Sequence, residues 1–256
     1  AEASRKKSSY REAALSALQR SLTALAPPGG TKETSPVCDF FPVAFPLIRD
    51  VLSPGGGSDA DGVSGDASAA ARKDQSPAND ADGGVGGNTI REMEEEAHRK
   101  ASEAKAGGAV AERALECLAS LCAGAGDAAS LAAAAPAVAS FAGEAIDPSA
   151  PWTRRAAGLR VVKSLSTRCG QLNVSGIEAW LDPLRESMGS CANDPKVSQL
   201  RSVAAEALGA STRALGSVGT SSTRDAFVKK LEEMRDGDRA PDVRGAAHRS
   251  LADALS

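Results

Sequence analysis

The chain has few aromatic residues, and this limits the kind of core that it can build. Phe, Trp and Tyr make up only 3% of the 256 residues, although 42% of the residues are hydrophobic. A core formed from such a chain must consist of leucine, valine and alanine. Because small side chains let helices approach closely, the composition favours stacked helical pairs.

The charge balance and the hydrophobic pattern exclude several other classes. The net charge is −3, without the basic surplus typical of nucleic-acid-binding proteins. No run of about 18 apolar residues is found, so we expect no membrane insertion. The chain does not begin with a charged and then apolar leader, so no signal peptide is expected. Since its first residue is not methionine, we expect a fragment or a processed chain.

Cysteines are scattered and odd in number, without a Cys-x-x-Cys pair. They are Cys38, Cys117, Cys122, Cys169 and Cys191. Most fall within predicted helices, where a free thiol behaves as a small buried apolar group. This usage indicates a reducing compartment, so we expect a cytoplasmic or nuclear location, or both.

Residue patterns that carry catalysis or metal binding are missing. The two histidines, His98 and His248, have no partner at zinc-ligand spacing. Residues 83–89 are rich in glycine but lack the lysine of a phosphate-binding loop, and no Gly-x-Ser-x-Gly is present. The sequence therefore predicts a protein that is not an enzyme, with no catalytic, cofactor-binding or metal site and no cofactor.

The chain is organised around copies of one helix, which is clearest at residues 194–209. Asp194 and Pro195 form a helix-start signal, and small or aliphatic residues follow at helical spacing. The pair Ala204 and Leu208 recurs 43 residues later, 47 residues earlier and a further 43 residues before that. The copies are Ala247/Leu251, Ala157/Val161 and Ala114/Leu118, and a further copy, Ala14/Leu18, stands 100 residues upstream of Ala114.

A period of 43 to 47 residues predicts an all-α fold of the α-solenoid class, an α-α superhelix of HEAT-like or armadillo-like helical repeats. An alanine-rich helical bundle is the alternative, but a bundle need not keep a fixed period. The repeat also carries charge, because an arginine precedes the alanine by three residues at Arg11, Arg154, Arg201 and Arg244. A turn aspartate precedes the arginine by seven residues in two copies, Asp147/Arg154 and Asp194/Arg201. We therefore expect Arg201 to pair with the carboxylate of Asp194 or Asp147.

The most basic of these helices, predicted over 151–168, allows two interpretations. It carries Arg154, Arg155, Arg160, Lys163 and Arg168. It is either a surface for an acidic partner, or a solvated flank with one Arg–Asp contact between repeats. We favour the second interpretation, because charge runs are usually solvated faces.

Composition divides the chain into three parts. Residues 1–52 are expected to hold HEAT-like helices, a half repeat at 4–26 and the first helix of the next repeat at 37–52. Residues 53–106 form a Gly/Ser/Asp-rich insertion that we expect to be disordered, with a charged helix-prone end. Residues 107–256 are expected to hold a helix over 109–123 and then the pairs 128–145 with 151–168, 174–189 with 195–213, and 222–235 with 241–255.

The first two helices resemble one family in particular. Residues Tyr10 to Leu18 (YREAALSAL), Phe40 to Ile48 (FFPVAFPLI) and Val51-Leu52 are similar to the proteasome adaptor and scaffold family. The resemblance implies a non-catalytic scaffold or adaptor that binds other proteins, among them proteasome subunits, and that tethers or regulates the proteasome. Nuclear transport receptors, phosphatase scaffolds and tubulin-folding cofactors share the same repeat pattern. A helical regulatory domain of a larger enzyme is a further alternative.

Overall fold

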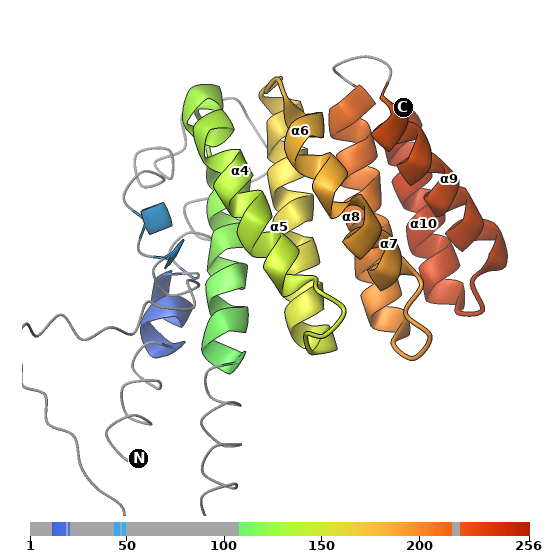
Figure 1. The fold of residues 1–256 in the computed structure, drawn as a ribbon, viewed down its shortest axis with the longest axis horizontal. Coiled ribbons are helices and arrows are strands. Elements are labelled where there is room, and N and C mark those ends of the chain that lie inside the picture. The colour runs from blue at the N-terminus through green and yellow to red at the C-terminus, as the bar shows by residue number, and fades with distance from the viewer. Residues whose placement is uncertain (1–11, 19, 21–43, 47, 50–107, 217–220) are drawn as a thin grey trace, which may run out of the picture.

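The computed structural model describes residues 12–18, 20, 44–46, 48–49, 108–216 and 221–256, and these ranges contain helices but no strand (Figure 1). The first long helix covers residues 108–124. It is followed by α4 (Ala128–Ala145), α5 (Trp152–Gln171), α6 (Ile177–Leu181), the 3-10 helix η1 (Asp182–Leu184), α7 (Arg185–Ala192), α8 (Ser198–Gly216), α9 (Ser222–Gly237) and α10 (Pro241–Leu255).

The helices form two layers that run side by side in sequence order (Figure 1). The front layer contains α4, the broken helix α6–η1–α7, and α9. The back layer contains the helix 108–124, α5, α8 and α10. The most extensive contacts join α5 to α8 and α8 to α10, so each repeat is bound to the next mainly through the back layer. This arrangement confirms the all-α solenoid that the 43-residue period predicted.

Hydrogen bonds between neighbouring repeats join residues one period apart. Back-layer contacts join Lys163 to Glu206 and Ser166 to Ser211, with sequence separations of 43 and 45. A front-layer contact joins Thr223 to Asp182, with a separation of 41. Both partners advance in the same direction along α5 and α8 while their separation stays close to one period, so equivalent helices of successive repeats run parallel and in register.

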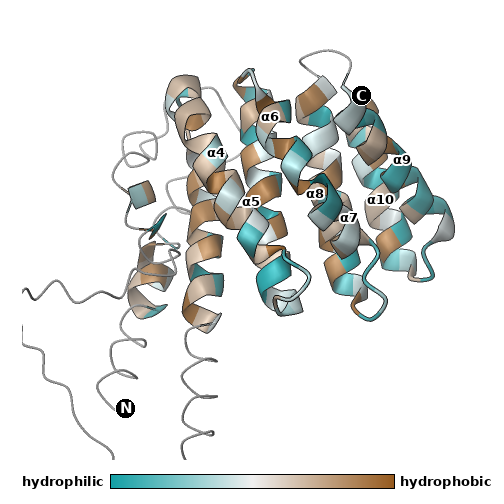
Figure 2. Cartoon of the chain, viewed as in Figure 1, coloured by the Kyte–Doolittle hydropathy of each residue, from teal (hydrophilic) through white to brown (hydrophobic). Residues whose placement is uncertain are grey.

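The core lies between the two layers and is made of small side chains. Its largest fully buried side chain is Phe227, and most of the others are alanine, leucine and valine. Hydrophilic residues colour the exposed sides of α7 and α9 in Figure 2. Small residues are also needed where back-layer helices meet, because a Cβ atom added at Gly209 would lie 2.5 Å from the Cβ atom of Ser250 in α10.

Local signals set where several helices begin. The Asp127 carboxylate accepts a 2.7 Å hydrogen bond from the Ser130 amide and so caps α4. Ser221 caps α9 in the same way, and Pro241 occupies the first turn of α10, where no amide is needed. The starts of these three helices lie where the sequence predicted them.

The helix predicted over 174–189 is wrong as a single element. Gly176 takes the left-handed conformation with φ of 75°, and the helix begins only at Ile177. Pro183 then lacks the amide that a continuous α-helix would use, and residues 182–184 form a 3-10 turn before α7. The front helix of this repeat is therefore broken between α6 and α7.

Residues far apart in the sequence meet at the N-terminal end of the stack. The Cys117 thiol donates to the Leu15 carbonyl at 3.0 Å, across a sequence separation of 102. Residues 12–18 are helical, and Leu15 is buried. They therefore lie against the helix 108–124, although a long segment separates the two. The predicted insertion at 53–106 lies outside the described residues, so the division into three parts stays a prediction.

The front-layer helix α4 is a long apolar segment, although the sequence analysis expected none. α4 is 18 residues long with a mean hydropathy of 1.2, so by length and composition it could cross a membrane. The many alanines of α4 raise its mean hydropathy. Because the helix packs against α5 as the front element of its repeat, a single match of this kind is weak evidence for a membrane span.

Candidate functional site

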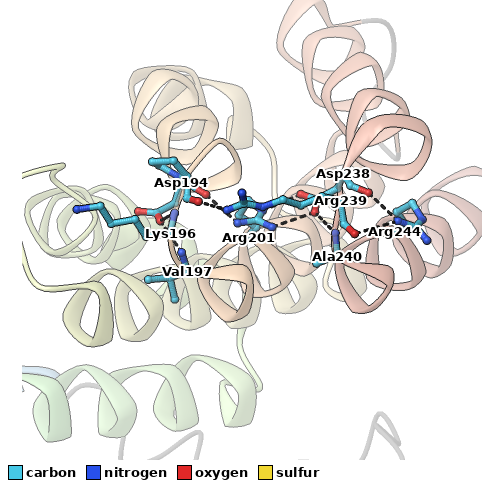
Figure 3. A network of polar contacts seen from close by, with 9 residues as sticks. Asp194, Lys196, Val197, Arg201, Asp238, Arg239, Ala240 and Arg244 are labelled. Carbon is cyan, nitrogen blue, oxygen red and sulfur yellow. Dashed lines mark hydrogen bonds and ion pairs between the residues drawn. The ribbon is translucent and has the colours of Figure 1, made fainter.

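A network of polar contacts runs along the turns that join the front and back helices, and its centre is a buried ion pair between Arg201 and Asp238 (Figure 3). Arg201 of α8 donates from Nε to Asp238 Oδ2 at 2.7 Å and from Nη2 to Asp238 Oδ1 at 2.9 Å. Its Nη1 donates to the Asp194 carbonyl at 2.8 Å. The side chains of Arg201 and Asp238 are only 5% and 9% exposed. One arginine thus joins the turn of its own repeat to the turn of the next.

The preceding turn is held in a similar way by Asp194. Its Oδ1 accepts from the amides of Lys196 and Val197 at 2.9 and 2.8 Å, and its Oδ2 accepts from Arg155 Nη1 at 3.0 Å. Burial opposes ionisation of this carboxyl group. The two amide hydrogen bonds and the Arg155 guanidinium outweigh that effect, so the pKa of Asp194 is lowered.

The charged form of Asp238 is favoured as well, and here the largest effect lowers the pKa. The hydrogen bond from Arg201 lowers the pKa of Asp238, and the amide of Ala240 adds to it at 2.8 Å. The pair raises the pKa of Arg201 in return. At the end of the series, Arg244 Nη1 donates to the carbonyls of Asp238 and Arg239. Arg201 and Asp238 are therefore both charged at neutral pH.

The expected arginine–aspartate pairs differ from the observed ones. Arg201 contacts the Asp194 carbonyl, but its carboxylate partner is Asp238, which the sequence analysis did not single out. Arg201 reaches forward across the repeat boundary, so its carboxylate partner is the turn aspartate of the following repeat and not that of its own repeat. The signal for Asp238 was its position 44 residues after Asp194, close to one period.

The arginine and aspartate of the repeat formed by α4 and α5 also differ from the expected pair. Arg155, not Arg154, binds Asp194 and is buried. The Asp147 carboxylate accepts from the amide and the hydroxyl of Ser149, and these hydrogen bonds lower its pKa. The fixed offset of seven residues therefore does not describe the pairing.

The other repeat positions can now be placed. Seven of them are buried between the layers: Ala114, Leu118, Ala157, Ala204, Leu208, Ala247 and Leu251. In the first helix Ala14 is exposed and Leu18 is half-buried, whereas Leu15 is buried. Arg11 lies outside the described residues.

The basic helix uses most of its charge in contacts between repeats. Lys163 Nζ lies 2.9 Å from Glu206 Oε2 in α8, and both side chains are nearly half exposed. Arg168 donates to the Ala125 carbonyl and to Gln171. Together with the pair of Arg155, these contacts support the interpretation of this helix as a structural element.

Two hollows lie on the surface of the described repeats. One, of about 450 Å³, lies beside the turn network and includes Arg201, Asp238 and Lys230 in its lining. The other, of about 610 Å³, is a groove across three successive back-layer helices, α5, α8 and α10. Both are formed between repeats, so their shape depends on the stacking.

Nucleophilic or metal-binding chemistry finds little support in the described ranges. The four cysteines there are buried, and burial raises the pKa of the Cys169 thiol to about 12. Within these ranges no group of three or more His, Cys, Asp or Glu side chains is placed to hold a metal ion.

Comparison with known proteins identifies the family. No curated protein and no solved structure matches the chain. A family model described as ECM29, C-terminal ARM-like repeats, matches residues 1–253. This match covers nearly the whole chain and agrees with the stacked helical pairs, so the chain belongs to the family of C-terminal ARM-like repeats of ECM29.

Proposed function

We propose that this chain is a non-catalytic protein-binding scaffold that tethers or regulates the proteasome. The observation that carries the proposal is the match of almost the whole chain to the ARM-like repeats of ECM29. The sequence resemblance to a proteasome adaptor points the same way. The proposal assigns the chain no reaction of its own.

The fold supports a scaffold because it offers a long surface held in a fixed shape. The repeats are joined by buried ion pairs at Arg155 and Arg201 and by the Lys163–Glu206 pair in the back layer. A stack of this kind exposes a continuous surface on which partner residues from several repeats can act together. Little ordering entropy is then lost when a partner binds.

We further propose a cytoplasmic or nuclear location for the chain. The four described cysteines are buried, and scattered cysteines used as small buried apolar groups are common in a reducing compartment. Fractionation of cells that express the full-length protein with a fluorescent tag tests this; a signal confined to the secretory pathway would contradict it.

Direct binding to purified proteasome particles tests the main proposal. The tagged chain is mixed with purified core particle or purified regulatory particle, and each mixture is separated on a native gel. We expect the chain to move with at least one particle and to saturate as its concentration rises. Migration of the chain apart from both particles at micromolar concentrations would overturn the proteasome assignment.

A matched control separates specific binding from adhesion of apolar surface. Phe227 is 1% exposed, so Phe227→Asp places a charge in the core and unfolds the last repeat. Binding that survives in this variant with unchanged affinity would indicate adhesion of unfolded chain and would contradict the scaffold proposal.

A further inference from the structure

The groove across α5, α8 and α10 has a floor of small residues. Its volume is about 610 Å³, and its floor includes Gly170, Gly209, Ala210 and Ser250. The helices touch here, since a Cβ atom at Gly170 would lie 3.2 Å from the Ala214 Cα atom. A ligand in this groove can therefore reach close to the helix backbones.

The lining of the groove carries two positive charges that form no ion pair within residues 108–216 and 221–256. Its lining holds three cationic side chains (Lys163, Arg213 and Arg249) and two anionic ones (Glu206 and Asp253). Lys163 and Glu206 pair with each other. Arg213 and Arg249 are exposed, and within residues 108–216 and 221–256 neither forms an ion pair.

The register of the helices sets how far apart these two arginines stand. Gly209 of α8 lies opposite Ser250 of α10, so Arg213 is about level with Asp253 and the residue after it. Arg249 therefore lies about five residues nearer the helix N-termini than Arg213 does. Five residues rise roughly 7.5 Å along a helix, and neighbouring axes lie about 8–10 Å apart. The Cα atoms of the two arginines are thus about 12 Å apart, which three or four residues of extended chain span at about 3.3 Å each.

We propose that this groove binds an extended protein segment that carries two carboxylates three or four residues apart. One carboxylate pairs with Arg213 and the other with Arg249, because a guanidinium holds a carboxylate through two parallel hydrogen bonds. The proposal rests on the scaffold function above and names the surface and the partner chemistry.

Asp253 gives the groove its selectivity. It lies in the lining near the level of Arg213, where it weakens the field of that arginine. A segment with many acidic residues close together would be repelled there more strongly than one with two spaced carboxylates. Removal of the Asp253 charge should therefore strengthen binding of the acidic segment.

Labelled peptides test the groove directly. The probe is a twelve-residue Gly/Ser peptide with blocked ends and two glutamates four positions apart, measured by fluorescence anisotropy at low salt. We expect saturable binding that falls with added salt. A peptide with glutamine at both positions should bind at least tenfold more weakly. Equal binding of both peptides, or none by the acidic one at millimolar protein, would overturn the proposal.

Variants locate the site. Arg213→Glu combined with Arg249→Glu should lower the affinity for the acidic peptide at least tenfold. Asp253→Asn should raise that affinity. The matched control is Lys229→Glu on α9, an exposed residue of the front layer, which should leave the affinity within twofold. Each variant is checked for an unchanged melting temperature. Equal affinity for the wild type and the double variant would rule the groove out.

The same double variant separates this inference from the proteasome assignment. If the wild type binds a proteasome particle and the double variant binds it equally well, the groove is not the docking site, although the scaffold function stands. If the acidic peptide binds the groove but neither particle binds the chain, the groove stands and the proteasome assignment fails.

Discussion

Arg201 and Asp238 form a two-point ion pair across a repeat boundary, with nitrogen–oxygen distances of 2.7 and 2.9 Å. They stand 37 residues apart in the sequence, and both side chains are almost fully buried. The third guanidinium contact, to the Asp194 carbonyl, fixes the arginine in its own repeat. The pair therefore couples the folding of one repeat to that of the next.

Removal of this arginine should destabilise the chain strongly. Arg201→Ala leaves the Asp238 carboxylate buried without its partner, and we expect a loss of about 3–5 kcal/mol of unfolding free energy in urea titrations. The control is Arg235→Ala, which breaks the exposed pair with Asp236 and should change the midpoint little. Equal effects of the two substitutions would contradict the buried role of Arg201.

Stability should fall in acid through Asp238. The pKa of Asp238 in the folded protein lies below its ordinary value of 3.8, so its charge stabilises the fold above that pH. This contribution is lost as the pH falls through the lowered value. The gap in melting temperature between wild type and Asp238→Asn should stay constant near neutral pH and close below about pH 3.8. Glu232→Gln, at an exposed position of α9, is the control, and a gap that persists at pH 2 would contradict the account.

Two glycines should respond in opposite directions to a methyl group. Gly209→Ala places its Cβ atom 2.5 Å from that of Ser250 and should cost about 1–3 kcal/mol, because α8 and α10 must separate. Gly189→Ala in α7 meets nothing within 4 Å and should stabilise the helix by roughly 0.5–1 kcal/mol. Chemical denaturation measures both, and a stabilised Gly209→Ala would disprove the close approach of α8 and α10.

Thiol reactivity should report unfolding. Burial raises the pKa values of Cys122 and Cys169, and all four described cysteines are buried, so their thiolates are scarce and inaccessible. In a Cys38→Ser background, a disulfide reagent should modify none of them in the native protein and all four in denaturant. Rapid native modification of any one would show that its helix opens readily.

Periodicity predicted the helical stacking well because four back-layer helices bury an alanine at the equivalent position: Ala114, Ala157, Ala204 and Ala247. The copy at Ala14 is the exception, since that residue is exposed. The ion pairs could not be placed, because each buried arginine binds the turn aspartate of the following repeat, Arg155 with Asp194 and Arg201 with Asp238. Only the contacts between repeats fix that partner.

The repeat pattern could not predict the break in the front helix or the groove either. Gly176 and Pro183 each permit a helix boundary, but neither requires one by itself. The groove depends on which residues of α5, α8 and α10 lie at the same level, and only the contacts between them fix that. Arg213 and Arg249 are in different repeats, so no local motif relates them.

The scaffold and the groove both depend on one claim, that α5, α8 and α10 lie side by side in register. Spin labels at Arg160 in α5 and His248 in α10, both exposed, test it through their separation in a pulsed electron resonance experiment. Two interaxial distances separate α5 from α10, so we expect one narrow distribution of label distances, with the two backbones roughly 20 Å apart. A broad distribution, or a mean beyond about twice that separation, would contradict the stacked repeats.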